Sequence, residues 1–479
     1  MKRILFTLLC LFGIMLTKAQ NPYDFVVPNS DGIRMYYKIT DPANNYVMLT
    51  KPEGEADVYP TIDPYYEQMY SLGITRFKVP AKVTHGGNTY DVKIIGSNTN
   101  TLGGGKEIIL PEGLTTLKDR ALWGISIKSI NFPSTLEYIG SEMFYYTSFG
   151  LTTPLIFDLS QTKITSLINA FTGGVPGNDD DSNITKLLFP ETLRTLRRLP
   201  RTLTGLTELT IPSAVTSMND IELLNLSSLY MKGSTPPASS NGELIFPNTI
   251  KIYVPTETTT SYAVAPGWSS FAGNLYEELN IGSTGYTTYY LETENFKVPT
   301  GCTAYLITGT KTGSTAPVEA RLIALPAGSI IPKQTGFILE GTPGKIAYRA
   351  AVTGTEADNS TNLMIGTSTE QEFSGTGYKY YVLANGPKGI GFYHQGTRDG
   401  ESIKLKAHQA GLRLSNLGPA PAKAFILDFE QAKRDLTTGI RSVETTQLQP
   451  ETIYDLQGRR VTQPTKGIYI VNGKKKVFN

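Results

Sequence analysis

The side chains that most often perform chemistry are few in this chain. Its three histidines, His85, His394 and His408, lack the H-E-x-x-H spacing or any similar spacing of a metal site. His85 and His394 each precede a pair of residues that contains glycine, so we expect both on turns. Cys302 is the only cysteine after residue 10, which indicates a buried thiol without a disulfide partner. We therefore predict no catalytic residue, no metal and no cofactor.

Glycine-rich and acidic segments do not change that expectation. The Gly-Gly-Gly-Lys segment at 103–106 lacks the Ser or Thr that follows the lysine of a P-loop. The aspartates of the segment 177–182 could bind Ca²⁺, but the spaced ligands and the distal glutamate of an EF-hand are absent, so we expect a solvated insertion. Paired carboxylates on a β scaffold would suit a glycoside hydrolase, which is the enzymatic alternative.

Tyrosine is the most promising residue type for recognition, and the chain contains 27 of them. A tyrosine offers a large contact area at a low cost in conformational entropy, although it is also an ordinary strand residue. Candidates for a partner contact are Tyr65, Tyr66, Tyr145 and Tyr146. The pattern alone leaves the ligand-binding residues unknown.

The scaffold for such contacts is indicated by short apolar runs that end in proline. These prolines are Pro111, Pro133, Pro190, Pro212 and Pro255. The first two are 22 residues apart, as are the next two, and weaker copies lie near 157 and 230. A period of about 22 residues with one short strand per unit predicts a leucine-rich-repeat solenoid. One unit cannot bury its own apolar face, so the units must stack into an elongated scaffold that suits recognition better than catalysis.

The first 19 residues have the pattern of a signal peptide. Lys2 and Arg3 precede an apolar run at 4–16, and small residues then allow cleavage between Ala19 and Gln20. The alternative is a retained membrane anchor, and no later segment is apolar over the roughly 20 residues of a span. Without the leader, 41 basic residues face 42 acidic ones, and this balance argues against a nucleic-acid partner. We expect an exported protein.

Five further regions follow the leader. We predict a β-rich cap at 20–100, the repeats at 101–275, a β-sandwich or small barrel at 280–430, a linker at 431–449 and a β tail at 450–479. Trp268 is expected to close the end of the repeat core, the alternative being an exposed binding aromatic. The fold class is therefore mainly β. The module strands are expected at 287–291, 304–307, 320–324, 336–339, 378–383, 390–393 and 424–427.

The repeat unit resembles the BspA-like leucine-rich repeat of bacterial surface proteins. The clearest copy is Phe-Pro-Ser-Thr-Leu-Glu-Tyr-Ile-Gly-Ser-Glu-Met-Phe at 132–144. The tail, with Ile-Tyr-Asp-Leu-Gln-Gly-Arg at 453–459 and Lys-Gly-Ile-Tyr-Ile-Val at 466–471, is similar to the type IX sorting-type domains of exported proteins. It departs from them in being shorter. The Asn/Cys position of standard leucine-rich repeats is also absent.

The resemblance implies a secreted or cell-surface adhesin, with association with the outer membrane as a further possibility. Its expected partner is a host matrix protein or a protein of a neighbouring cell, and no catalysis is expected. The first alternative is a carbohydrate-binding surface protein, whose tyrosines would stack on sugar rings. Less favoured alternatives are the glycoside hydrolase and a structural component of the cell surface.

Overall fold

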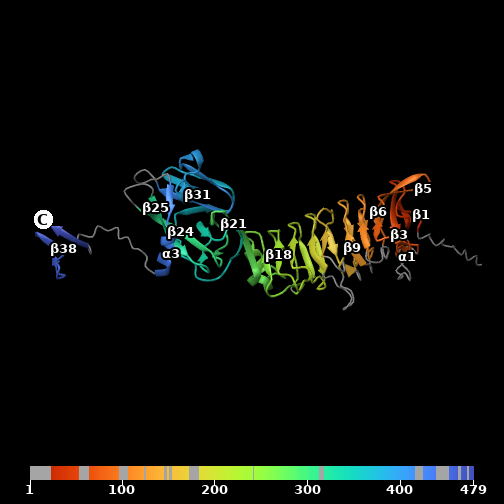
Figure 1. Cartoon of the computed structure of the whole chain (residues 1–479), viewed down its shortest axis with the longest axis horizontal. Coiled ribbons are helices and arrows are strands. Elements are labelled where there is room, and N and C mark those ends of the chain that lie inside the picture. The colour runs from red at the N-terminus through yellow and green to blue at the C-terminus, as the bar shows by residue number, and fades with distance from the viewer. Residues whose placement is uncertain are drawn as a thin grey trace, which may run out of the picture.

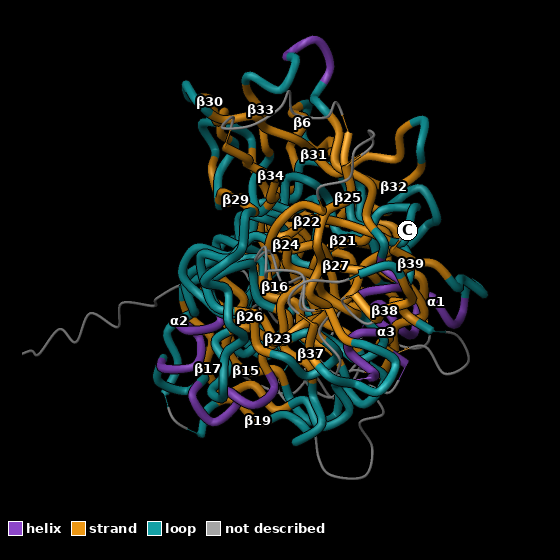
Figure 2. The backbone as a smooth tube through the Cα atoms, turned by 90° about the vertical axis from the view of Figure 1, so that its left-hand side faces the viewer, coloured by secondary structure: helices purple, strands orange, loops and turns teal. Residues whose placement is uncertain are grey.

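The computed structural model describes residues 23–52, 64–96, 106–122, 126–144, 148–149, 154–171, 183–240, 242–311, 318–415, 424–438, 453–461, 465–471 and 474–478. Most of the elements are short strands, and the few helices lie at the periphery (Figures 1 and 2). The prediction of a mainly β fold is thus confirmed. Within these residues, no helix combines the length and the apolar composition needed to cross a bilayer.

The N-terminal part is an antiparallel group of strands that continues into the repeats. Strand β2 pairs antiparallel with β1 and β3, and β3 pairs in parallel with β6. Since β6 also pairs in parallel with β8, the stack of repeat strands begins before residue 101. The elements are β1 (Phe25–Pro28), β2 (Arg34–Asp41), β3 (Tyr46–Thr50), α1 (Pro64–Ser71), β4 (Arg76–Lys78), β5 (Lys82–His85) and β6 (Asn88–Ile95).

The strands that precede the recurrent prolines form one row, here called row one, which Figure 1 shows side by side along the molecule. Along each strand, alternate residues point into the core, because successive side chains of a strand face opposite sides. The inward positions include Ile108, Ile127, Phe157, Leu187, Leu209, Leu229 and Ile252, all buried. Besides β4, row one contains β7 (Lys106–Ile109), β9 (Ser126–Ile130), β11 (Ser148–Phe149), β12 (Leu155–Asp158), β14 (Ile184–Leu188), β16 (Glu208–Ile211), β18 (Ser228–Met231), β20 (Lys251–Tyr253) and β21 (Leu275–Ile281).

The expectation of one strand per unit is wrong, because the second apolar patch of each unit also pairs. These short strands form row two, in which Leu117 lies beside Ile139 and Leu196 beside Met218. A run such as Thr116–Leu117 is too short to give a strand pattern in the sequence, and only its neighbours satisfy its backbone groups. After β6, row two contains β8 (Thr116–Leu117), β10 (Tyr138–Ile139), β13 (Ser166–Ile168), β15 (Thr195–Leu199), β17 (Ser217–Glu222) and β19 (Leu244–Ile245).

The recurrent prolines end the row-one strands and start the turns toward row two. A proline has no N–H for a strand partner, so it interrupts the ladder. Its carbonyl oxygen instead accepts the N–H of the residue three positions later. The donor to Pro133 is Leu136, at 3.0 Å, and the donor to Pro190 is Leu193, at 3.1 Å. Both leucines are buried, which explains why an apolar residue follows each proline at this spacing.

Trp268 is buried in the hydrophobic core of the repeats, near its C-terminal end. It lies between α2 (Thr259–Val264) and η2 (Ser269–Asn274) and is 0% exposed. Its indole Nε1 donates to the carbonyl oxygen of Pro237 at 2.8 Å, and its ring meets Tyr262 edge-to-face. The alternative of an exposed binding aromatic is therefore wrong for Trp268.

Strand β21 belongs to both the repeats and the following module. Its N-terminal half pairs in parallel with β20 through Leu275, and its next residues pair antiparallel with β28. The sheet therefore continues from row one through β21 into β28, β23 and β26. Figure 1 shows the module directly beyond β21 at the end of the row. The backbone ladder joins the two parts without an intervening linker.

The module is a nearly closed, barrel-like sheet rather than a sandwich of two separate sheets. Nine strands run in the order β22-β27-β24-β25-β35-β32-β31-β34-β29. The edges approach each other where Ala410 N donates to Thr288 Oγ1 at 3.3 Å, and the Tyr290 ring covers Gly366, where a Cβ would lie 2.3 Å from it. Strand β24 is buried on both faces, with Tyr305 in the barrel core and Leu306 in the core toward the repeat sheet.

The module strands agree with the seven expected runs and include additional short ones. They are β22 (Tyr286–Tyr289), β23 (Phe296–Lys297), β24 (Thr303–Lys311), β25 (Val318–Leu325), β26 (Ile330–Ile331), β27 (Phe337–Glu340), β28 (Gly344–Ala350), β29 (Met364–Thr367), β30 (Gln371–Ser374), β31 (Tyr378–Gly386), β32 (Gly389–Tyr393), β33 (Ser402–Leu405), β34 (Gln409–Ser415) and β35 (Ala424–Leu427). A 3-10 helix, η3 (Gly396–Arg398), follows β32.

The predicted linker begins as a helix. Helix α3 (Phe429–Thr438) packs against the module through Phe429, which stacks on Tyr286 with ring centroids 4.3 Å apart, and through the buried Ala432. Lys433 Nζ pairs with Glu340 at 2.8 Å. The polar composition that suggested a linker belongs to the solvent-facing side of this amphipathic helix.

The tail forms a small sheet of four strands, where two or three were expected. The order is β37-β36-β38-β39, and Gly458 has a left-handed backbone, φ 78°, in the first turn. The second expected turn, at 472–473, lies outside the described residues. The strands are β36 (Ile453–Tyr454), β37 (Arg460–Val461), β38 (Gly467–Val471) and β39 (Lys474–Phe478).

Candidate functional site

The structure gives each histidine a packing role. His85 ends β5 and its ring stacks on Phe25, with centroids 4.4 Å apart and planes 4° apart. His394 follows β32 and lies 4.9 Å from the Tyr381 ring. His408 Nδ1 lies 3.3 Å from the Tyr290 carbonyl oxygen. The described part of the chain holds no group of three or more His, Cys, Asp or Glu side chains that could bind a metal.

The other residues that the sequence suggested for a chemical or processing role are either buried or lie outside the described residues. Cys302 is buried, and burial raises the pKa of its thiol, which disfavours the reactive thiolate. The acidic segment 177–182 and the cleavage residues Ala19 and Gln20 lie outside the described residues. The burial of Cys302 therefore gives no support to a nucleophilic role for this thiol.

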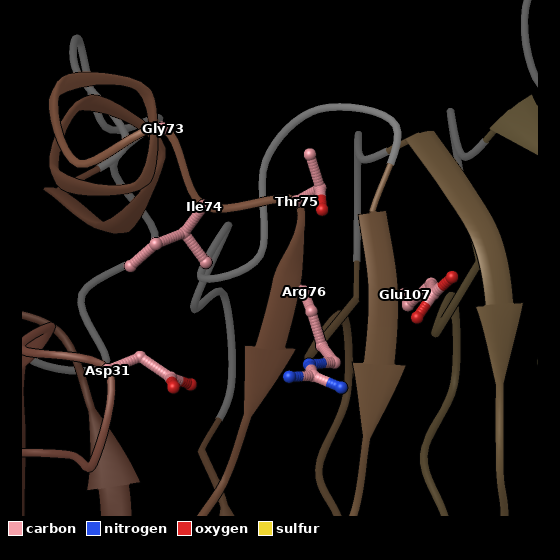
Figure 3. A pocket seen from close by; sticks show the side chains of 6 residues that line it. All are labelled: Asp31, Gly73, Ile74, Thr75, Arg76 and Glu107. Carbon is pink, nitrogen blue, oxygen red and sulfur yellow. The ribbon is translucent and has the colours of Figure 1, made fainter.

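One polar pocket of about 340 Å³ lies at the start of row one, between the end of α1 and β7. In Figure 3 the Arg76 side chain lies between the carboxylates of Asp31 and Glu107. Gly73, Ile74 and Thr75 complete the lining. Because two carboxylates flank a single guanidinium, the pocket favours neither an anion nor a small cation strongly.

A pair of facing carboxyl groups does exist, but it is inside the protein. Glu277 on β21 is 0% exposed, and Glu294, shortly before β23, is 3% exposed. Burial, and then the neighbouring Glu294, raise the pKa of Glu277 to about 8. A glycoside hydrolase needs its two carboxyl groups to reach a bound sugar from both sides. These two are closed to solvent, so they do not form such a site.

The most distinctive surface feature is a column of tyrosines on the outer face of row one. Strand β18 reads Ser-Leu-Tyr-Met with Leu229 and Met231 buried, so that Tyr230 points outward. The pairing of β18, β20 and β21 places Tyr230 beside Tyr253 and Tyr253 beside Tyr276. All three side chains are half-buried. We call Tyr230, Tyr253 and Tyr276 the tyrosine ladder.

The rings of the ladder lie side by side, and two of them are stacked. Those of Tyr230 and Tyr253 have centroids 4.6 Å apart and planes 8° apart. The rings of Tyr253 and Tyr276 are 6.1 Å apart and tilted by 42°. The rings of Tyr230 and Tyr253 therefore lie face to face on the sheet, and the Tyr276 ring is tilted against this pair.

Charged side chains from both parts of the molecule border the ladder. Lys251 Nζ lies 5.9 Å from the ring centroid of Tyr276, within the range of a cation–π contact. Lys345, on β28, lies equally far from the ring of Tyr230 and pairs with Glu278 at 2.5 Å. Burial and the nearby Tyr230 raise the pKa of Tyr253, so its hydroxyl stays protonated and can donate a hydrogen bond. The ladder is an apolar strip with polar edges.

The sequence candidates for partner contact did not include these tyrosines. Tyr65 is 0% exposed and its hydroxyl donates to the Thr50 carbonyl oxygen at 2.7 Å, so it is a core residue. The side chain of Tyr66, and all of Tyr145 and Tyr146, lie outside the described residues. The signal that was available is a tyrosine directly after the first inward residue of three successive row-one strands: Leu-Tyr at 229–230, Ile-Tyr at 252–253 and Leu-Tyr at 275–276.

Known structures offer distant similarities to this fold. A leucine rich cell surface protein from Faecalibacterium prausnitzii A2-165 has 16% identity and a TM-score of 0.27, over 49% of this chain and 68% of that chain. The pneumococcal vaccine antigen PcpA has 14% identity and a TM-score of 0.16, over 53% and 97%. A leucine-rich repeat protein from Bacteroides ovatus ATCC 8483 has 16% identity and a TM-score of 0.14, over 48% and 71%. No curated protein sequence matches.

The sequence match to a family is confined to the repeats. The family model described as the BspA type leucine rich repeat region matches residues 87–172 in six copies. This stretch contains the clearest repeat found in the sequence, at 132–144. The resemblance of the tail to sorting-type domains stays a prediction. Residues 87–172 are thus similar to the BspA type of leucine-rich repeat, in agreement with the repeat pattern and the paired strands.

Proposed function

We propose that this protein is exported to the cell surface or beyond, and that it binds other proteins without catalysing a reaction. The observation that carries the proposal is the tyrosine ladder, because it presents preorganised aromatic surface on a rigid sheet. Rigid tyrosines lose little entropy on binding and combine apolar area with a hydrogen-bonding group. The repeats then serve as the scaffold that fixes their spacing.

The geometry of the rings favours a polypeptide partner over a glycan. A sugar that stacks on an aromatic residue needs the open face of the ring. In the ladder the faces of Tyr230 and Tyr253 cover each other, and Lys251 and Lys345 lie over other ring faces. The accessible ring edges and hydroxyl groups suit the mixture of apolar side chains and backbone amides that a protein offers. Glycan binding is the first alternative outcome.

The proposed location of the protein rests on two segments, the leader and the tail. The leader pattern at residues 1–19 supports export, and the similarity of the tail to sorting-type domains supports retention at the surface. Among the described elements the tail is a separate four-stranded sheet, rich in lysine along β39. A segment of this size is suited to serve as a signal that other components recognise.

The binding proposal can be tested with an extracellular-matrix protein panel and a glycan array, probed with the chain lacking residues 1–19. We expect binding to at least one protein of the panel, and a loss of about tenfold or more in affinity for Tyr253→Ala. Tyr378→Ala is the control, because Tyr378 is a strand tyrosine outside the ladder, on β31, where it is 40% exposed and has Arg413 over its ring.

Three outcomes are informative. Binding of proteins that Tyr253→Ala weakens and Tyr378→Ala does not supports the ladder as the site. Binding of glycans alone would replace the proposal by the carbohydrate alternative. Equal binding by both variants would show that the ladder is not the binding surface.

A further inference from the structure

Strand β21 carries a ring of the ladder on one face and a buried carboxyl group on the other. Tyr276 and Glu278 are on the outer face, where Glu278 pairs with Lys345. Glu277, between them, points inward and is 0% exposed. The hydrogen bonds of the Glu277 side chain therefore help to position the strand that carries Tyr276, the last ring of the ladder. The inference drawn from this arrangement rests on the proposed binding role of the ladder.

Glu277 is bonded to elements on both sides of β21. Its Oε1 accepts the Thr259 hydroxyl, from α2, at 2.8 Å. Its Oε2 accepts the Tyr348 hydroxyl, from β28, at 2.5 Å. The carboxyl group thus links the helix that closes the repeats to the first module strand that pairs with β21.

Glu294 lies next to Glu277 and lacks a donor for one oxygen. Its Oε1 accepts the N–H of Thr260 at 2.6 Å. Its Oε2 is buried, and among the described residues no N–H or hydroxyl group reaches it. The carboxyl groups of Glu277 and Glu294 accept from the N–H groups of the adjacent residues Thr259 and Thr260, and two carboxylates cannot donate a hydrogen bond to each other. A proton on the pair supplies the missing donor.

The groups that face the pair are hydroxyl and carboxyl groups, and His408 lies beyond them, with its ring 6.1 Å from that of Tyr289 and its Nδ1 3.9 Å from Glu257 Oε2. The titratable groups that face the pair are Tyr348 on β28 and Tyr289 on β22, which share a hydrogen bond of 2.9 Å, and Glu257 lies near Tyr289. Neither Glu277 nor Glu294 forms an ion pair with any described residue. Burial accordingly raises the pKa of Glu277 to about 8, against the opposing hydrogen bonds from Tyr348 and Thr259.

We propose that Glu277 and Glu294 share one proton, and that this proton holds β21, with the last ring of the ladder, against α2 and β28. When β21 detaches, the Glu277 carboxyl group reaches solvent and its pKa returns toward the ordinary value of a glutamate. The free energy needed to detach β21 therefore falls as the pH rises. It becomes constant at the pH where the attached strand has also lost the proton. Glu277 is in this sense a positioning residue for the ladder.

The test is amide hydrogen exchange of residues 275–281 in the full chain, corrected for the intrinsic pH dependence of exchange. For the unmodified protein we expect protection to fall by about tenfold or more between pH 5.5 and 7.5, and to change little above pH 8.5. Glu277→Gln keeps an acceptor and supplies a permanent donor, so its protection should change less than about twofold over the same range.

Two further variants keep the test decisive. Glu222→Gln, a half-buried carboxyl on β17, is the control and should show the pH profile of the unmodified protein. If Glu277→Gln does not fold, Glu294→Gln removes the neighbouring carboxyl group and offers an amide donor to Glu277, so it should give a weaker pH dependence than the unmodified protein. A flat profile of the unmodified protein, or an unchanged profile of both pair variants, would overturn the proposal. No ligand is used, so a ladder that binds nothing would leave this result intact.

Discussion

The ring of Tyr230 lies 4.6 Å from that of Tyr253, nearly the distance of about 4.8 Å that separates neighbouring strands of any sheet. The backbone therefore sets the ring spacing, and no induced fit is needed to form the stack. Parallel pairing in register also brings Tyr276 beside Tyr253, although that ring is 6.1 Å away and tilted by 42°. Rings held in this way form a preorganised surface, which Lys251, Lys345 and Glu278 border.

The contribution of a ladder ring can be divided into its stacking and its hydroxyl group. Tyr253→Phe keeps the ring contacts and should leave thermal stability unchanged, while it weakens binding of a protein partner. Tyr253→Ala also removes the stacking and should lower the free energy of unfolding by about 0.5–1.5 kcal/mol beyond the lost buried area. Thermal unfolding and binding measured on both variants check this. Equal effects of the two variants on stability would contradict the stacking role.

The raised pKa of Glu277 predicts how stability depends on pH. The folded protein keeps the proton up to about pH 8, whereas an unfolded glutamate loses it near pH 4.5. Between these values the folded state binds more protons, so stability falls as the pH rises, by at most about 1.4 kcal/mol per pH unit, and levels off above pH 8. Melting temperatures from pH 4.5 to 9 measure this. Glu277→Gln should remove this part of the slope, and an identical slope in the variant would contradict the assignment.

Gly140 is required by the close approach of two successive repeats. A Cβ at this position would lie 2.3 Å from the backbone N of Asp119, and the Gly140 N–H donates to the Leu117 carbonyl oxygen at 2.8 Å. Gly140→Ala must push the two units apart and should cost about 3 kcal/mol of unfolding free energy. Gly309→Ala is the control, because nothing lies within 4 Å of a Cβ there. Urea unfolding of both variants distinguishes a local clash from a general intolerance of substitution.

The closing role of Trp268 predicts a large effect of its removal. Trp268→Ala leaves a cavity under α2 and an unsatisfied carbonyl oxygen at Pro237, at a cost of about 3–5 kcal/mol. Val264→Ala, on the same short helix, is the control, since Val264 is 74% exposed and should cost almost nothing. Denaturant unfolding of the two variants can be compared by circular dichroism of the backbone, a signal that does not require Trp268. A small effect at Trp268 would show that the core does not depend on this closure.

We expect the tail to influence where the protein is located and to contribute little to the stability of the rest of the chain. Deletion of residues 452–479 removes only the small sheet of β36 to β39, so the melting temperature of the rest should stay within a few degrees. We expect the deletion to change the distribution of the protein between cell surface and medium. A melting temperature lowered by many degrees, with an unchanged distribution, would show that the tail is structural.

The sequence by itself determined the features that depend on neighbours along the chain. A proline that ends a strand and an apolar residue three positions later are local requirements, so Pro133 and Leu136 revealed the repeat period. Alternation of apolar and polar residues likewise revealed strands such as the one at 304–307. Trp268 was recognisable as a closing residue because large aromatic side chains at the end of a repeat array must be covered.

The tertiary structure decided what depends on residues far apart in the chain. The second strand row arises from two-residue segments that become strands only beside their neighbours. The closing of the barrel brings Thr288 to Ala410, and the helix at 429–438 depends on the module surface under Phe429. Tyr230, Tyr253 and Tyr276 form a ladder only through the register of three strands. Glu277 and Glu294 share a proton only because folding buries both, since desolvation of a carboxyl group is a property of its surroundings and not of its sequence position.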